Sequence, residues 1–577
     1  MKKYFKYIKK YWYCFLFGPF FMVLEAAGEF ILPLLSKKIV DVGAANGDTG
    51  YIISKGLIMA AIAVGMLITG ILGANFAIRG ASRTAAGLRL EVFKKIQTFS
   101  FSDIDRFTAG SLITRITNDI TQIQSFIQSL LRGMFRSPVM LAGALIMAFT
   151  MNPAMAKILL ITVPVLAVFI AAVIIIATPR YTKMQQQLDE LNIDTRESIV
   201  NEKVVKSFVR EDFEKKKFGV INEKLRVRST KALKMMLLIG PATTLAISFT
   251  TVAVVWLAGG QLAAGNLEIG TLTAFITYLT QVLNALNFLA NIVLTGTRAA
   301  ASDKRITEVL NTSPEISDEN PDHTAAVREG SVSFKNVSFR YFRESREPVL
   351  DNISLDINAG ELVGIVGPTG CGKTTLVSLL SRLYVPESGE IIIGGRNIKE
   401  YSLKALESGI AAVLQKNTLF SGNIEENLRW GNDAATEGEL TDAAKLASAH
   451  DFIMSFAEGY KTELGQGGAN LSGGQKQRLC IARAVLKKPK ILILDDSTSA
   501  VDTATDARIR SGLRENLPGT TKIIIAQRIN SVIDADKIIV MNEGKIAGIG
   551  THSELLESCD TYRDIYLSQQ GEADLDG

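Results

Sequence analysis

The chain has 577 residues, which is more than a single domain usually holds, so we expect at least two domains. Its composition is 47% hydrophobic and 21% charged, and a net charge of +5 is too small to indicate nucleic-acid binding. The 4 cysteines form no CxxC pair, and only 3 histidines are present. These counts argue against a disulfide framework and against a zinc site.

Long uncharged runs dominate the first half of the chain, and six of them are near the length that crosses a bilayer. The first run follows a basic start, as in a secretion signal, but it is long and contains Glu25 and Glu29. We therefore expect a retained helix. Asn152-Pro153 is the turn signal between the third and fourth spans. The expected spans are residues 11–35, 56–78, 137–156, 158–179, 237–260 and 269–297.

Lysine and arginine are distributed unevenly between the connections. The first ten residues and the segments 79–136 and 180–234 are rich in both, whereas 41–55, 152–153 and 261–268 carry almost none. Because basic loops stay inside, we expect both termini and the two long segments to be cytoplasmic, in a multi-pass protein of the cell membrane. These long segments show helical spacing, and roughly 25 helical residues would extend about 37 Å beyond the bilayer.

Glu25 and Glu29 are four residues apart and share one face of the first expected helix. Carboxylates inside a membrane usually face a cavity or a partner, so one interpretation is a role with a cationic substrate or a proton. The other interpretation is a structural ion pair or a position near the outer boundary. We favour the structural interpretation.

The second half of the chain reads as a soluble α/β domain. Residues 311–326 are polar and contain two prolines, which indicates a linker, and we expect a domain over 327–570 and a polar tail over 571–577. The run ELVGIVGPTGCGKTTLVSLL is a strand, a glycine-rich loop and a helix, the context of a phosphate-binding loop. The predicted ATP-binding residues in it are Gly367, Pro368, Thr369, Gly370, Cys371, Gly372, Lys373, Thr374 and Thr375.

The residue types of this loop fit a nucleotide with its magnesium. Gly370 and Gly372 let backbone N–H groups approach phosphates, and Lys373 neutralises phosphate charge. The Thr374 hydroxyl can bind Mg²⁺, as can Asp495 at the end of the buried strand in KPKILILDD. ATP and Mg²⁺ are therefore the expected cofactors.

Further motifs make the chain resemble the ATP-binding cassette (ABC) family over nearly its whole length. They are LSGGQ, AAVLQKNTLFSGNI and STSAVD, in the family's order and at its spacing. The six spans with two long cytoplasmic segments resemble the exporter branch, in which LITRITND and VVKSFVRE look like coupling loops. The implied fold is an all-α six-helix transmembrane domain of the type I exporter followed by an α/β P-loop cassette.

The resemblance implies roles that spacing does not. Tyr341 would stack on adenine, and Gln415 would contact Mg²⁺ and sense the membrane domain. The signature residues Leu471, Ser472, Gly473, Gly474 and Gln475 would contact a nucleotide held by a partner cassette, which implies an obligate dimer. The D-loop of the family would comprise Ser499, Ala500, Val501 and Asp502, within the STSAVD motif.

Two positions depart from the family's pattern for hydrolysis. Asp496 stands where a catalytic glutamate is usual, and Gln527 stands where a histidine is usual. Aspartate is shorter by one methylene, roughly 1.5 Å of reach, and a misplacement of about 1 Å can cost on the order of a hundredfold in rate. Glutamine cannot become cationic. LSGGQ, which would serve the partner's nucleotide, is intact, and this combination resembles heterodimeric exporters in which one site hydrolyses ATP and the other mainly holds it. The resemblance implies a heterodimer in which this chain holds the slow site. A homodimer that tolerates both changes is the alternative.

The expected activity is ATP-driven export of amphipathic compounds, such as drugs or lipids. An ATP-gated channel or regulatory sensor on the same frame is a second class, but the sequence shows no additional regulatory domain. An importer is a third class, and the fusion of membrane and cassette parts argues against it. The transported compound is not encoded in any motif.

Overall fold

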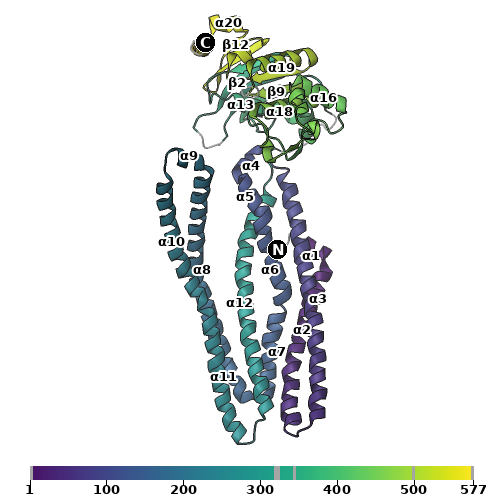
Figure 1. The fold of residues 1–577 in the computed structure, drawn as a ribbon, viewed down its shortest axis with the longest axis vertical. Coiled ribbons are helices and arrows are strands. Elements are labelled where there is room, and N and C mark those ends of the chain that lie inside the picture. The colour runs from purple at the N-terminus through teal and green to yellow at the C-terminus, as the bar shows by residue number, and fades with distance from the viewer. Residues whose placement is uncertain (1–3, 317–324, 342–345, 497–500, 574–577) are drawn as a thin grey trace. The chain divides into compact units, whose positions relative to one another are not determined.

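The structure is a computed structural model of the chain, and it describes residues 4–316, 325–341, 346–496 and 501–573 (Figure 1). The chain forms two compact units. The first comprises Met1–Gln97 and Gly110–Thr312, and the second comprises Thr98–Ala109 and Ser313–Gly577. A short segment from the first half of the chain, 98–109, therefore packs with the second half.

The first unit is built from long helices, and six stretches of them are long and apolar enough to cross a membrane. This confirms the expected number of spans. The long helices are α2 (Trp12–Lys38), α3 (Thr49–Ile96), α6 (Ile120–Gly133), α7 (Arg136–Met151), α8 (Pro153–Val200), α10 (Glu211–Leu237), α11 (Ile239–Ala263) and α12 (Ile269–Asn311). The shorter ones are α1 (Phe5–Lys10), η2 (Ile39–Ala44), α5 (Ala109–Thr114), η3 (Arg115–Asp119) and α9 (Glu202–Ser207).

The turn between α7 and α8 shows where hydropathy alone misplaces a boundary. The third span was expected to run to residue 156, but α7 ends at Met151. Asn152 then caps α8 by accepting hydrogen bonds from the N–H groups of Ala154 and Met155, and Pro153 begins the helix. The uncharged run continues through this tight turn, so composition could not mark the break.

The 48 residues of α8 correspond to about 72 Å of helix, more than twice the hydrocarbon thickness of a bilayer. The helix therefore continues well beyond the membrane, as expected for the second long cytoplasmic segment. Helix α10 lies beside it (Figure 1). The short helix α9 joins the two and overlaps the VVKSFVRE motif. LITRITND, by contrast, lies on α5 and η3, after the short helix α4 (Phe101–Phe107) that follows α3.

Arg136 pairs with both intramembrane glutamates. Its guanidinium donates a hydrogen bond to Glu29, and its Nε lies 3.9 Å from Oε2 of Glu25. Each of the three side chains is less than one-third exposed. The pairing agrees with the structural interpretation of these carboxylates.

A buried carboxylate ties the C-terminal part of α12 to η3. The Asp119 side chain is 2% exposed and accepts hydrogen bonds from Ser302 Oγ at 2.9 Å and from Arg305 Nε at 2.7 Å. Close by, Arg115 forms an ion pair of 2.9 Å with Glu308. These charge-assisted contacts hold the two helical segments together where they leave the apolar region.

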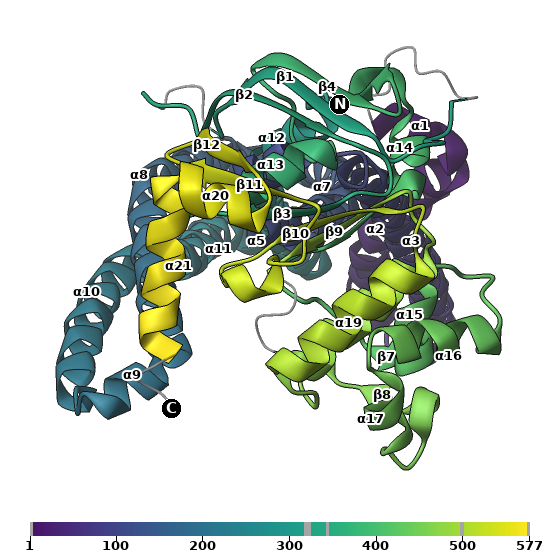
Figure 2. The ribbon, with the colours of Figure 1, turned by 90° about the horizontal axis from the view of Figure 1, so that it is seen from above.

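The second unit is an α/β domain whose main sheet has six strands in the order β12-β11-β3-β10-β9-β6, all parallel except β12. Its strands are β3 (Leu362–Val366), β6 (Ile410–Val413), β9 (Ile491–Asp495), β10 (Thr521–Ile525), β11 (Lys537–Asn542) and β12 (Lys545–Gly550). Figure 2 shows β3, β10 and β9 side by side. Every residue of these three strands is buried, which explains their continuous apolar runs.

A four-stranded antiparallel sheet, β2-β1-β4-β5, completes the strand part of the domain with a small β7–β8 pair. These strands are β1 (Val332–Phe339), β2 (Leu350–Ile357), β4 (Ser388–Ile393), β5 (Arg396–Asn397), β7 (Gly422–Asn423) and β8 (Glu463–Leu464). Strand β1 pairs antiparallel with both β2 and β4.

The helices of this domain include the one that begins at Lys373 and the one that begins within LSGGQ. They are α13 (Lys373–Leu380), α14 (Leu403–Gly409), α15 (Ile424–Arg429), α16 (Glu437–Leu446), α17 (His450–Met454), α18 (Gly473–Leu486), α19 (Thr503–Asn516), α20 (His552–Ser558) and α21 (Asp560–Ala573). Short 3-10 turns occur at η4 (Ile398–Glu400), η5 (Gly459–Lys461), η6 (Gln466–Gly468) and η7 (Ile529–Ser531). Architecture and fold class agree with the expectation from the sequence.

Candidate functional site

The glycine-rich loop joins the end of β3 to the start of α13 in a conformation that requires glycine. Gly367 has φ +151°, and a Cβ there would lie 2.1 Å from the Met541 carbonyl oxygen. Gly372 has φ +99°, and a Cβ there would lie 2.7 Å from Leu350 Cδ2. Gly370 has open space around it and is required only by its φ of +85°. The loop is therefore fixed by close packing at both ends and by backbone conformation in the middle.

Lys373 places a cation inside this loop. Its Nζ donates hydrogen bonds to the carbonyl oxygens of Gly367 at 2.7 Å and Pro368 at 2.8 Å, and the residue is 9% exposed. Pro368, Thr369 and Gly370 form the exposed rim of the loop, while Cys371 is buried beneath it. A polyphosphate at the rim would meet backbone N–H groups and the Lys373 ammonium together.

Asp495 and Thr374 form a pair that fits a magnesium ion. The Thr374 hydroxyl lies 3.3 Å from Oδ1 of Asp495, which is 2% exposed. In the described part of the chain, the other carboxylate oxygen, Oδ2, has no hydrogen-bond partner. Burial is the main cause that raises the pKa of Asp495, and neighbouring Asp496 raises it further, whereas Thr374 and Lys373 oppose the shift. A buried carboxylate oxygen without a partner, beside a hydroxyl, is the donor set of a hard cation.

The two departures from the family's pattern contact each other. The Gln527 side-chain amide donates a hydrogen bond of 3.1 Å to Oδ2 of Asp496. Asp496 has φ +48°, and its carbonyl oxygen accepts a hydrogen bond of 3.1 Å from Gln477 Nε2. Gln477 is 1% exposed and was not predicted, because nothing in the sequence relates a residue of α18 to the strand end that it supports.

Tyr341, the expected adenine platform, lies beside the phosphate-binding loop. Its side chain is 41% exposed, and its hydroxyl lies 3.0 Å from Oγ1 of Thr375. The ring stands nearly perpendicular to those of Phe339 and Tyr384, with centroids 5.0 and 5.1 Å away. Gln415 is exposed, and among the described contacts none joins it to Thr374 or Asp495. The described contacts join Thr374 of the loop to Asp495 at the strand end, and Gln415 follows β6, the strand that pairs with β9.

The signature segment forms the N-terminus of α18. Ser472 caps this helix: its hydroxyl accepts from the N–H of Gln475 at 3.3 Å, and Gln475 Oε1 accepts from the N–H of Ser472 at 2.9 Å. Leu471 is buried, Gly473 is exposed and Gly474 is half-buried. Such a helix start attracts anions.

Only part of the predicted D-loop can be placed. Val501 is buried, and Asp502 caps α19 by accepting a hydrogen bond of 2.9 Å from the N–H of Thr505. Ser499 and Ala500 lie outside the described residues. The capping by Asp502 fixes the point at which this segment enters α19.

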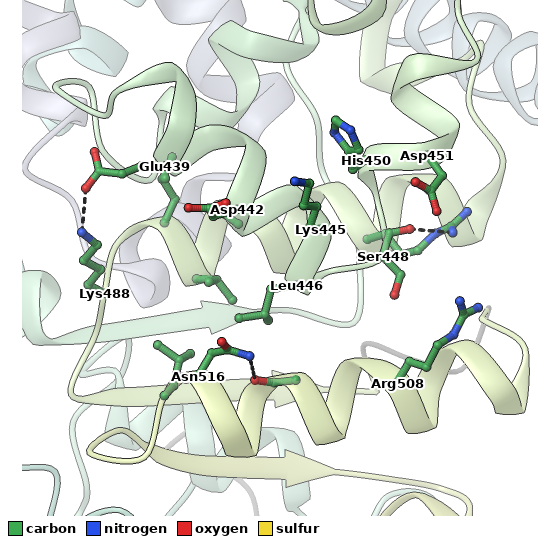
Figure 3. A pocket seen from close by; sticks show the side chains of 16 residues that line it. Glu439, Asp442, Lys445, Leu446, Ser448, His450, Asp451, Lys488, Arg508 and Asn516 are labelled. Atoms are coloured by element: carbon green, nitrogen blue, oxygen red, sulfur yellow. Dashed lines mark hydrogen bonds and ion pairs between the residues drawn. The ribbon is translucent and has the colours of Figure 1, made fainter.

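A separate cavity of about 740 Å³ lies between α16, α18 and α19 (Figure 3). Its charged lining is partly paired: Lys488 contacts Glu439 at 2.6 Å, and Arg478 donates to the Ser448 carbonyl oxygen at 2.9 Å. None of the predicted nucleotide-site residues lines it. This cavity is thus distinct from the candidate site.

One α/β domain carries a phosphate-binding loop, a magnesium-type carboxylate and a capped signature helix, which together define a nucleotide-binding domain. The six membrane-length helices of the other unit indicate a membrane transporter. Residues 15–286 match the family described as the ABC transporter transmembrane region, and residues 350–499 match the family described as the ABC transporter. The chain belongs to the ABC transporters, on the exporter branch, and it is a multi-pass membrane protein with an ATP-hydrolysing cassette.

Relatives of similar length extend this assignment. The uncharacterized ABC transporter ATP-binding protein YfiB of Bacillus subtilis (strain 168) is 37% identical over 551 residues, 95% of each chain. The ATP-dependent lipid A-core flippase of Desulfotalea psychrophila is 32% identical over 553 residues, 95% of this chain and 96% of its own length. The solved structure of a bacterial Atm1-family ABC exporter with ATP bound has a TM-score of 0.82 at 26% identity, covering 97% of this chain and 98% of that one.

Proposed function

We propose that this chain is one subunit of a heterodimeric exporter that uses ATP to move amphipathic compounds out across the cell membrane. Its cassette and both termini face the cytoplasm, as the distribution of lysine and arginine predicts. Its own site binds ATP and Mg²⁺ through Lys373, Thr374 and Asp495 but hydrolyses slowly. Its signature helix completes the faster site of a partner subunit that carries glutamate and histidine at the two altered positions.

The hydrogen bond between Gln527 and Asp496 carries this proposal. A general base must reach the attacking water, and the Asp496 carboxylate is both one methylene short and engaged by an amide. Glutamine also supplies no cationic state for the γ-phosphate. Mg²⁺ and phosphate would be bound by other groups, Asp495 and Lys373. The contact of Asp495 with Thr374 and the position of Lys373 inside the loop support this binding. The site is therefore proposed to hold nucleotide longer than it takes to turn it over.

A lipid or lipid-like amphiphile is the substrate class that we favour. One sequence relative of matching length is by its name a lipid A-core flippase. The similar solved structure is of an exporter.

Two substitutions in this chain distinguish the heterodimer from a homodimer. In a heterodimer, Lys373→Ala removes nucleotide from the slow site and should leave most steady-state ATP hydrolysis. Ser472→Ala weakens the partner's fast site and should remove most of it, about a hundredfold if one transition-state contact is lost. In a homodimer both substitutions act on both sites and reduce hydrolysis alike.

The measurement is ATP hydrolysis by the full-length chain in nanodiscs, alone and with the co-expressed partner subunit. Thermal unfolding of each variant is the control that the cassettes remain folded. Rapid hydrolysis by the chain alone would overturn the heterodimer. ATP-dependent uptake of a fluorescent lysophospholipid into inside-out vesicles tests export itself.

A further inference from the structure

The side chain of Tyr384 contacts two parts of the second unit, the candidate adenine platform Tyr341 and the short helix α4. On one side it meets Tyr341, at 5.1 Å between centroids and an interplanar angle of 89°. On the other side its hydroxyl donates a hydrogen bond of 2.8 Å to Oδ2 of Asp105 on α4. Phe101 of the same short helix lies 6.4 Å from the Tyr384 ring. One side chain thus contacts the candidate adenine platform and a segment from the first half of the chain.

Helix α4 is anchored in this unit at its N-terminus as well. Ser100 caps α4 together with Asp103, which is 7% exposed. Oδ2 of that aspartate also accepts a hydrogen bond from the backbone N–H of Glu315 at 3.3 Å. The Glu315 carboxylate in turn accepts from Ser102. The chain enters α4 from α3 and leaves it into α5, which begins the membrane-length helical stretch Ala109–Met151. A displacement of α4 is therefore passed on covalently to α3 and to that stretch.

The Tyr341 end of this path is coupled to the phosphate-binding loop. Its hydroxyl lies 3.0 Å from Thr375, two residues after Lys373 on α13. The position of the ring is set by two perpendicular aromatic neighbours, Phe339 and Tyr384, and such edge contacts are directional. The position of the Tyr341 ring, and with it the stacking of an adenine base on this ring, therefore depends on Tyr384.

We propose that Tyr384 is a positioning residue that links adenine binding at Tyr341 to the movement of α4, through its ring on one side and its hydroxyl on the other. The proposal rests on the proposed function, in which ATP drives the membrane helices. Tyr384 itself takes no part in hydrolysis. Its two contacts have separate consequences, because the ring serves nucleotide binding and the hydroxyl serves the response of the membrane helices.

Two substitutions separate these contacts. Tyr384→Phe keeps the ring and removes the hydrogen bond to Asp105, so ATP affinity should stay within about twofold while the membrane response weakens about threefold, the value of one modest hydrogen bond. Tyr384→Leu removes both contacts, and ATP affinity should also fall about fivefold because the edge contact with Tyr341 is lost. Asp105→Ala should reproduce Tyr384→Phe, whereas Asp105→Asn keeps an acceptor oxygen and should restore most of the response.

The membrane response is measured without any transported compound. The chain has 3 tryptophans, of which Trp12 and Trp256 lie on α2 and α11, so in a Trp430→Phe background the intrinsic emission reports the membrane helices. The readout is the amplitude and midpoint of the emission change on adding ATP to the full-length protein in detergent micelles, with the tryptophans of the partner subunit replaced by phenylalanine so that only Trp12 and Trp256 emit. ATP affinity is measured separately by displacement of a fluorescent nucleotide. Tyr460→Phe is the matched control, since it removes another tyrosine contact of 2.9 Å, to His450.

The expected result is a weakened emission response in Tyr384→Phe and in Asp105→Ala, with no further loss when the two are combined. If the two effects add, or if Tyr384→Phe behaves as Tyr460→Phe does, the link is wrong. If Tyr384→Phe lowers ATP affinity as much as Tyr384→Leu does, the separation of ring and hydroxyl is wrong. An intact emission response without export of any amphiphile would contradict the proposed function and leave the role of Tyr384 standing.

Discussion

Replacing Asp496 with glutamate should accelerate ATP hydrolysis at this chain's own site. The carboxylate lies next to the magnesium-type Asp495 but is shorter than glutamate by roughly 1.5 Å. It is also held by Gln527 at 3.1 Å. Since misplacing a water-orienting group by about 1 Å can cost on the order of a hundredfold, Asp496→Glu should recover about tenfold, and combination with Gln527→His should recover more.

The backbone opposes part of this gain. Asp496 has φ +48°, a left-handed conformation in which aspartate is found more often than longer side chains. We expect Asp496→Glu to destabilise the cassette slightly, by about 1 kcal/mol. The thermal midpoint should therefore fall even as the rate rises.

The assay is single-turnover hydrolysis of radiolabelled ATP by the full-length chain with the proposed partner subunit, whose phosphate-binding lysine is replaced so that only this chain's site reacts. Asp496→Asn is the control, because it keeps the side-chain length and removes the charge. An unchanged rate in Asp496→Glu, with normal ATP binding, would show that carboxylate reach does not limit this site.

Three further substitutions test the geometry. Asp495→Asn should weaken Mg²⁺-dependent ATP binding about tenfold or more, measured by nucleotide titration with and without Mg²⁺, because the buried oxygen without a partner loses its charge. Gly367→Ala should abolish ATP binding or folding, seen by nucleotide titration and thermal unfolding, since its Cβ would lie 2.1 Å from Met541 O. Arg136→Ala leaves Glu29 without its partner and should destabilise the membrane unit by about 3 kcal/mol, measured by thermal unfolding in nanodiscs. An unchanged midpoint would contradict the structural role of this pair.

The sequence predicted the parts of the fold whose signals are local. Six apolar runs and the strand, loop and helix around Lys373 depend on neighbouring residues, and both features are present in the structure. The end of α7 was misplaced because an uncharged turn and an uncharged span have the same composition. LITRITND lies on α5 and η3, just after α4, and its role as a coupling loop stays a prediction.

The contacts that matter most at the site join residues far apart in the chain. Gln527 and Asp496 are 31 positions apart, and Tyr384 and Asp105 are 279 apart. Each departure from the family's pattern could be read singly, but their hydrogen bond depends on how β9 and β10 pair in the sheet. No periodicity or motif spacing contains that information, which is why Gln477 and Tyr384 went unpredicted.

The residue that caps α18, Ser472, is one of several residue types that can cap a helix. Aspartate, asparagine and threonine also cap helices, so stability alone would allow any of them at position 472. A serine hydroxyl accepts the N–H of Gln475 with a lone pair and still has its own hydrogen to give away. Aspartate would cap equally well, yet its negative charge would repel a phosphate. A serine at position 472 thus meets two requirements. It caps α18 within the chain, and it keeps an uncharged hydroxyl donor for a phosphate of a neighbouring molecule.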